Sequence, residues 1–196
     1  MGKARLEAFS DGVIAIILTI MVLELHVPEH PTLSDLVPLL PSFASYVLSF
    51  IYIGIYWNNH HHLLHATRRV DAAVLWANLH LLFWLSLVPF TTGWMGHNHW
   101  AATPVALYGV NLLMCGAAYW ILQHEIIVEQ GPNSIVKRAV GADLKGKGSL
   151  VAYMTAIPAA FASRGISAVL YIAVALMWLV PDRRIERALA NRPSDE

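Results

Sequence analysis

The chain has 196 residues, of which 57% are hydrophobic and only 13% are charged. Soluble domains usually carry about 25% charged residues, so this composition excludes an ordinary soluble protein and indicates a membrane protein. The formal net charge is zero, so bulk charge gives no reason to expect nucleic acid as a partner. Cys115 is the single cysteine, which excludes a disulfide framework or a cysteine metal site within one chain.

Six stretches approach the roughly 20 apolar residues that a membrane-spanning helix needs. They cover residues 7–27, 36–59, 72–94, 104–124, 150–163 and 166–180. The last two are short and are separated by Arg164 and Gly165, so they form either a tight hairpin or one tilted helix broken at the glycine. We favour the hairpin, because together they are too long for one span. The sequence therefore predicts an all-α fold in which residues 1–196 form one six-helix transmembrane bundle with no soluble domain.

Basic residues favour the cytoplasmic side of a membrane, and here they fall on one side of the predicted spans. Only Arg164 of the thirteen Lys and Arg residues lies elsewhere. The other twelve are Lys3, Arg5, Arg68, Arg69, Lys137, Arg138, Lys145, Lys147, Arg183, Arg184, Arg187 and Arg192. This pattern predicts a multi-pass protein with both termini in the cytoplasm. The polar stretch 129–148 is then a cytoplasmic loop.

Two carboxylates mark the ends of the first predicted span. A carboxylate inside a spanning segment is costly unless it is paired or hydrated. Asp11 lies near the cytoplasmic end and Glu24 near the outer end, and about 20 Å of helix separates them, so they cannot share one site. Ser10 and Asp11 could cap the start of the helix, or Asp11 could pair with Arg5. A carboxylate at this position also argues against a cleavable signal.

One narrow stripe runs along the same span. Gly12, Ile16, Thr19 and Leu23 recur at intervals of four, three and four residues, which places them on one face of a helix. Asp11 lies well off this stripe and is expected to face neighbouring helices. Ordinary helix packing would explain such a stripe, because any apolar helix has one, and the spacing alone leaves this alternative open.

The opening of the chain resembles a known family. Arg5-x-x-x-Phe9-Ser10-Asp11, followed at once by an apolar helix, is similar to the signature of the transmembrane protein 175 potassium channels, in their short prokaryotic form. The segment Trp57-Asn58-Asn59-His60-His61 is also similar to that family. The resemblance implies a homotetramer in a prokaryotic cell membrane, whose first helix lines the pore. It also implies passive potassium conduction without the usual Thr-Val-Gly-Tyr-Gly filter.

The resemblance assigns roles to individual residues. It implies an apolar constriction at Ile16, a selectivity-related threonine layer at Thr19 and a further apolar ring at Leu23. An apolar collar of this kind can gate by dewetting. Threonine hydroxyls can replace part of the water around potassium, which is less tightly hydrated than sodium. The remaining assignment is a bracing network of Arg5, Phe9, Ser10 and Asp11. Gly12, Ile20 and Glu24 are candidates for the flanks of the pore, but Glu24 lies off the stripe, so we expect a solvated or paired helix end there instead. No cofactor is expected besides the permeant potassium ions, and the expected partners are identical subunits and the lipid bilayer.

A histidine cluster supports alternative functions. His60, His61, His62 and His65 lie at the end of the second span, and His61 and His65 are spaced as a possible metal pair. No acidic residue or cysteine lies beside them at ligand spacing, so we expect hydrogen bonds within the bundle instead of a metal site. An ion-coupled transporter or a metal-binding membrane protein remains the alternative to a channel. A transporter would be expected to carry ionisable groups near midspan, and few are present here.

No pattern of an enzyme is present. His124-Glu125 begins like a zinc-protease motif but lacks the second histidine, and there is no Gly-x-Ser-x-Gly elbow. The other polar groups within the spans, Asn78, His80 and Asn111, are expected to make satisfied packing contacts between helices. Pro89 is expected to kink the third span.

Overall fold

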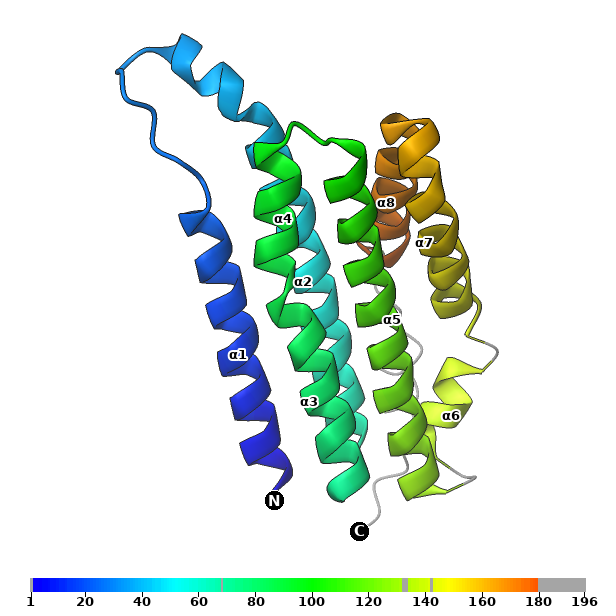
Figure 1. The fold of residues 1–196 in the computed structure, drawn as a ribbon. Helices are drawn as coiled ribbons and strands as arrows, with labels where there is room; N and C mark the ends of the chain where they lie inside the picture. The colour runs from blue at the N-terminus through cyan, green and yellow to red at the C-terminus, as the bar shows by residue number, and fades with distance from the viewer. Residues whose placement is uncertain (1, 68, 132–133, 142, 180–196) are drawn as a thin grey trace.

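The computed structural model describes residues 2–67, 69–131, 134–141 and 143–179 (Figure 1). All of the regular structure in these residues is helical, which confirms the predicted all-α class. The elements are α1 (Lys3–Leu23), the 3-10 helix η1 (Leu33–Leu39), α2 (Leu40–Ala66), α3 (Ala72–Ser86), α4 (Val88–His97), α5 (Ala102–Gln130), α6 (Ile135–Val140), α7 (Leu144–Ala162) and α8 (Arg164–Leu179).

Four helical segments of the described chain are long and apolar enough to cross a membrane: α1, η1 with α2, α3 with α4, and α5. The fifth and sixth predicted spans correspond to α7 and to the shorter apolar helix α8. These two helices pack against each other as a hairpin, as the sequence indicates. The Ser167 hydroxyl donates to the carbonyl of Ala156 at 2.7 Å and so joins them. Six full crossings therefore remain a prediction that depends on this hairpin.

The long helices run roughly antiparallel, so that their connections alternate between two ends of the bundle (Figure 1). The N-terminus, the α2–α3 connection and α6 lie at one end, while η1 and the α4–α5 connection lie at the other. The described basic residues in the first turn of α1, around the α2–α3 connection and in α6 therefore share one end, as the charge pattern predicts. Arg68 and residues 180–196, which include the four C-terminal arginines, lie outside the described residues.

Several helix ends differ from the sequence-based prediction. α1 runs from Lys3 to Leu23, where residues 7–27 were predicted, so Glu24 caps the helix instead of lying inside it. α2 and α5 extend beyond the predicted ends at residues 59 and 124, and α7 begins before residue 150. The length of an apolar stretch predicts only the part of a helix that lies inside the membrane. The helix itself can continue beyond the membrane surface through polar sequence. Lys145 and Lys147 thus belong to α7 and not to a loop.

The third predicted span is divided at Leu87. α3 ends at Ser86 and α4 begins at Val88, with Pro89 in its first turn. Proline has no N–H group to donate to the preceding turn, so the backbone bends there and a new helix begins. The kink expected at Pro89 is therefore present, but the span also extends to His97.

Two buried clusters of side chains form the core. One joins α1, α2, α3 and α5, and the other joins α2, α4, α5, α7 and α8. α2 and α5 contribute to both clusters. Buried polar side chains tie the second cluster together: the Ser49 hydroxyl lies 2.7 Å from that of Thr92 and 3.0 Å from that of Tyr108.

α4 approaches α2 closely at Gly96. A Cβ atom added to Gly96 would lie 2.6 Å from the Cα atom of Ser42, a backbone atom that cannot move aside. We expect Gly96→Ala to destabilise the protein by about 1–3 kcal/mol through overpacking. Thermal unfolding of the purified protein in detergent measures this. Gly54→Ala is the control, because nothing lies within 4 Å of its added Cβ; equal loss of stability in both variants would contradict the prediction.

Candidate functional site

One face of α1 is packed inside the subunit. Its residues are Leu6, Ser10, Ile14, Ile17 and Met21, all of them buried. They point toward α2, α3 and α4, the elements that contact α1. This packing fixes which side of the helix remains available for another role.

The opposite face of α1 is exposed along its whole length. Ile16 is 58% exposed and Leu23 78% exposed, and Gly12 and Thr19 are also exposed. The exposed stripe consists of Arg5, Phe9, Gly12, Ile16, Thr19 and Leu23, at intervals of four and three residues in alternation. An average spacing of 3.5 residues keeps side chains on one seam of a helix. The residues assigned to the pore therefore lie together on the face that the subunit itself does not cover.

Thr19 can present oxygen lone pairs from this stripe. Its hydroxyl lies 3.1 Å from the carbonyl of Ala15 and 2.9 Å from that of Ile16, and it donates its proton to these backbone oxygens. Because the proton is used within the helix, the remaining lone pairs of the hydroxyl oxygen face outward. Such an oxygen can accept from water or coordinate a cation, but it cannot donate to an anion at the same time.

A directed chain of hydrogen bonds holds the buried face. The Ser10 hydroxyl donates to the carbonyl of Leu6 at 2.9 Å, so it accepts from the amide of Asn78 at 3.0 Å. The amide oxygen of Asn78 then accepts from Nε2 of His60 at 2.7 Å. Ser10, Asn78 and His60 are at most 1% exposed. The chain joins α1 through α3 to α2 with every member satisfied, and it confirms that His60 bonds within the bundle.

Asp11 is held by a tryptophan. Nε1 of Trp57 donates to Oδ1 of Asp11 at 3.0 Å. Asp11 lies well inside α1, whose N-cap residue is Gly2, so the expectation that Ser10 and Asp11 cap the helix is wrong. No ion pair joins Arg5 to Asp11 in the described chain. Arg5 and Phe9 lie instead on the exposed stripe, away from the network of Ser10 and Asp11.

One more hydrogen bond fixes the start of α1, where a carboxylate oxygen is also buried. The Lys3 ammonium group donates to the carbonyl of His65 at 2.8 Å, tying the start of α1 to the end of α2. Oε1 of Glu7 is buried and has no hydrogen-bond partner among the described residues. Glu7 lies one turn before Asp11, so two carboxylates face the same side of α1 near its base.

α4 holds the outer end of α1. A Cβ atom added to Gly93 would lie 2.8 Å from Oε2 of Glu24, so this carboxylate packs directly against α4. Beside it, Nε2 of His97 lies 3.1 Å from Nδ1 of His26. A groove of about 660 Å³ between α1 and α4 is lined in part by Ile16, Ile20 and Glu24. Ile20 and Glu24 thus flank the exposed stripe on the side of α4.

Part of the histidine cluster stacks in a row along one face of α2. The ring of His61 stacks between those of Trp57 and His65, with centroid distances of 6.4 Å and 6.0 Å. Within the residues that the structure describes, no group of three His, Cys, Asp or Glu side chains could hold a metal ion. The i, i+4 pair of His61 and His65 therefore has no third ligand there.

Comparison with known proteins identifies the family. The sequence profile described as "Endosomal/lysosomal potassium channel TMEM175" matches residues 5–89. A potassium channel of Chryseobacterium sp. (strain P1-3) is 53% identical over 189 residues, which are 96% of this chain and 98% of that protein. The chain belongs to the TMEM175 family.

Other TMEM175 relatives share the fold or part of the sequence. The crystal structure of a lysosomal potassium-selective channel TMEM175 homologue from Chamaesiphon minutus matches with a TM-score of 0.78 and 27% identity, over 92% of this chain and 97% of that one. The human endosomal/lysosomal proton channel TMEM175 is 36% identical over 96 residues, which are 42% of this chain and 19% of that protein. The resemblance read from the Arg5-x-x-x-Phe9-Ser10-Asp11 motif is thereby confirmed.

The segment that matches the TMEM175 profile contains both the exposed stripe of α1 and the residues that hold its buried face. Residues 5–89 hold the exposed stripe as well as Ser10, Trp57, His60 and Asn78. The sequence predicted only a packing contact for Asn78. In the structure its side chain, on α3, bonds to Ser10 of α1 and to His60 of α2. No role was predicted for Glu7. The sequence offered two signals: a polar amide, Asn78, within an apolar span, and the i, i+4 spacing of Glu7 and Asp11. Neither signal identifies the residue to which these side chains bond.

We expect Asn78→Leu to destabilise the bundle by about 1–3 kcal/mol, because it removes two buried hydrogen bonds and leaves His60 without its acceptor. Thermal unfolding in detergent measures the loss. Asn98→Leu is the matched control, because the Asn98 side chain bonds only to its own helix, at the carbonyl of Trp94, and is exposed. If both variants unfold at the same temperature as the wild type, the network does not hold α1.

Proposed function

We propose that the protein is a potassium-permeable channel in which the exposed stripes of α1 from four identical subunits face one central pore. The observation that carries this proposal is the division of α1 into two faces. Polar bonds anchor one face to α2 and α3, while the residues assigned to the pore lie uncovered on the other. The names of the prokaryotic relatives, which are described as potassium channels, support the same function.

Ile16 is the proposed gate. Four isoleucine side chains at one level form an apolar collar from which water withdraws when the collar is narrow, and an ion cannot cross a dry gap. Small outward movement of α1 would rewet the collar and allow a partly hydrated ion to pass. Leu23 would form a second apolar ring at the outer end of the same stripe.

Thr19 is the proposed source of selectivity. Its outward lone pairs can replace part of the hydration shell of a cation just beyond the collar. Potassium gives up this water at lower cost than sodium, so the layer favours potassium modestly. Because a hydroxyl carries no full charge, it does not trap the ion, and conduction stays fast.

The proposal places the protein in the cytoplasmic membrane of a prokaryotic cell with both termini inside, as the charge pattern favours. It assigns no enzymatic activity. Between Gly12 and Leu23 the exposed stripe carries no ionisable side chain. A carrier that couples its substrate to protons would be expected to hold such a group at midspan, so this favours a passive pore over the transporter alternative.

Replacing Ile16 by asparagine tests the gate. We expect Ile16→Asn to raise potassium flux into proteoliposomes at least about tenfold, because a polar collar stays wet. Ile172→Asn is the matched control, since Ile172 is an exposed isoleucine on α8, away from the stripe. If both variants behave as the wild type does, or if the wild type passes no cation under any gradient, the pore assignment fails.

Thr19→Val tests the selectivity layer with a side chain of nearly the same shape. We expect the ratio of potassium to sodium flux to fall several-fold toward unity, while total cation flux is retained, because the collar at Ile16 is unchanged. Reversal potentials under bi-ionic conditions measure the ratio. An unchanged ratio would show that selectivity arises elsewhere.

A further inference from the structure

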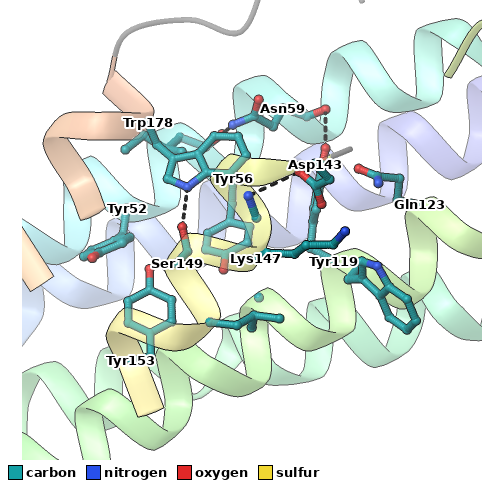
Figure 2. Close-up of a pocket in the computed structure, with 15 residues that line it drawn as sticks. Tyr52, Tyr56, Asn59, Tyr119, Gln123, Asp143, Lys147, Ser149, Tyr153 and Trp178 are labelled. Atoms are coloured by element: carbon teal, nitrogen blue, oxygen red, sulfur yellow. Dashed lines mark hydrogen bonds between the residues drawn. The ribbon is translucent and has the colours of Figure 1, made fainter. Parts of the chain in front are cut away.

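A cavity of about 360 Å³ lies on the side of α2 that faces away from α1. α2, α5, α7 and the end of α8 enclose it (Figure 2). Its deeper wall is apolar and aromatic, with Tyr52 and Ile55 from α2, Gly116 from α5, and Leu150 and Tyr153 from α7. No step of the proposed conduction uses this space.

Three of the aromatic side chains in the wall use their polar atoms in hydrogen bonds within the bundle. The Tyr52 hydroxyl donates to the carbonyl of Tyr171 at 2.6 Å, and the Tyr119 hydroxyl donates to that of Asn59 at 3.2 Å. Nε1 of Trp178 donates to the Ser149 hydroxyl at 2.8 Å (Figure 2). These bonds hold the rings in place and leave mainly apolar surface facing the cavity. A flexible hydrocarbon chain suits such a wall better than a polar solute does.

The other end of the cavity is polar and carries the charged residues Lys147 and Asp143. Lys147 lines it and is exposed, whereas the ammonium group of Lys145 lies 5.7 Å from the ring centroid of Trp178. Asp143 is the acidic residue of the lining, but its Oδ1 accepts from the backbone N–H of Gly146, so the carboxylate caps α7. A negative group at the mouth would therefore meet the exposed ammonium group of Lys147, while the Asp143 carboxylate stays directed at the N-terminus of α7.

The cavity therefore has an apolar part and a charged, polar part, which suits an amphiphilic ligand. Lys147 and Tyr153 are six residues apart on α7, which is about 9 Å along the helix. Lys147 shares the lining of the mouth with Asn59 of α2 and Gln123 of α5. These two residues lie at the ends of the second and fourth predicted spans, where the positive-inside pattern places the cytoplasmic surface. Anionic lipids bind in basic pockets between helices at that surface.

We propose that this cavity binds an anionic phospholipid of the cytoplasmic leaflet, with its phosphate at Lys147 and the start of one acyl chain between α2, α5 and α7. The lipid would brace the face of α2 that carries Tyr52 and Asn59, behind the face whose Trp57 and His60 hold α1. This inference requires the chain to span the membrane but not to conduct potassium, so the two proposals can fail separately.

Thermal unfolding of the purified protein in detergent tests the headgroup. We expect dioleoylphosphatidylglycerol to raise the unfolding temperature saturably by about 3 °C or more, and dioleoylphosphatidylcholine, with identical chains, to do so much less. Lys147→Gln should raise the half-saturating concentration at least about tenfold, because a charge-assisted contact is lost. Lys137→Gln is the matched control: it removes an exposed lysine of α6 that does not line the cavity.

Equal effects of the two lipids, or of the two lysine variants, would overturn the proposal. A shift of the same size with glycerol phosphate would also overturn it, because that result would indicate a site for a soluble anion. Gly116→Leu tests the acyl chain by filling the cavity and should abolish the lipid effect. The glycine's Cβ would lie 3.2 Å from the flexible end of Leu150, which can move aside.

If Gly116→Leu does not fold, a fluorescence measurement tests the binding of the acyl chain instead. Phosphatidylglycerol with brominated acyl chains should quench tryptophan emission of the wild type saturably, since Trp120 and Trp178 both line the cavity. Trp178→Phe should lose part of this saturable quenching, whereas Trp76→Phe, which removes an exposed tryptophan on α3, should not lose it. Equal losses in the two variants would place the lipid elsewhere.

Discussion

The orientation of α1 depends on a few polar bonds to the neighbouring helices. α1 is apolar on nearly all sides, and lipid is as apolar as the interior of the bundle, so hydrophobicity alone does not choose which face turns inward. The bonds from Asn78 to Ser10 and from Trp57 to Asp11 make that choice. Once they are formed, Ile16, Thr19 and Leu23 must lie on the uncovered side. The proposed pore is thus determined by contacts on the opposite face of the helix.

α2 lies between the two regions for which a function is proposed. One side of it carries Trp57 and His60, which hold α1. Its other side carries Tyr52 and Asn59, which line the aromatic cavity. The bend at Leu87 lets α4 follow the outer half of α2 while α3 packs against α1 and α5. α2 therefore packs against both the helix proposed to line the pore and the wall of the aromatic cavity.

The stripe of α1 is longer than the predicted pore. Arg5 and Phe9 continue the same seam toward the start of α1, although the family resemblance assigned them to bracing alongside Ser10 and Asp11. No side-chain hydrogen bond or ion pair in the described chain joins them to Ser10 or Asp11. In the assembly proposed above, their exposure would place them where identical subunits meet or at the inner mouth of the pore, so any bracing by them would be between subunits.

The sequence by itself determined the membrane class, the helical fold, the segregation of charge and the stripe of Gly12, Ile16, Thr19 and Leu23. These properties depend on composition and on periodicity along one helix, which are local. Only the tertiary structure decided that Asp11 bonds to Trp57 and not to Arg5, that Asn78 links three helices, and that an aromatic cavity lies behind α2. The physical reason is that periodicity fixes directions within a helix, whereas partners depend on how helices rotate against one another.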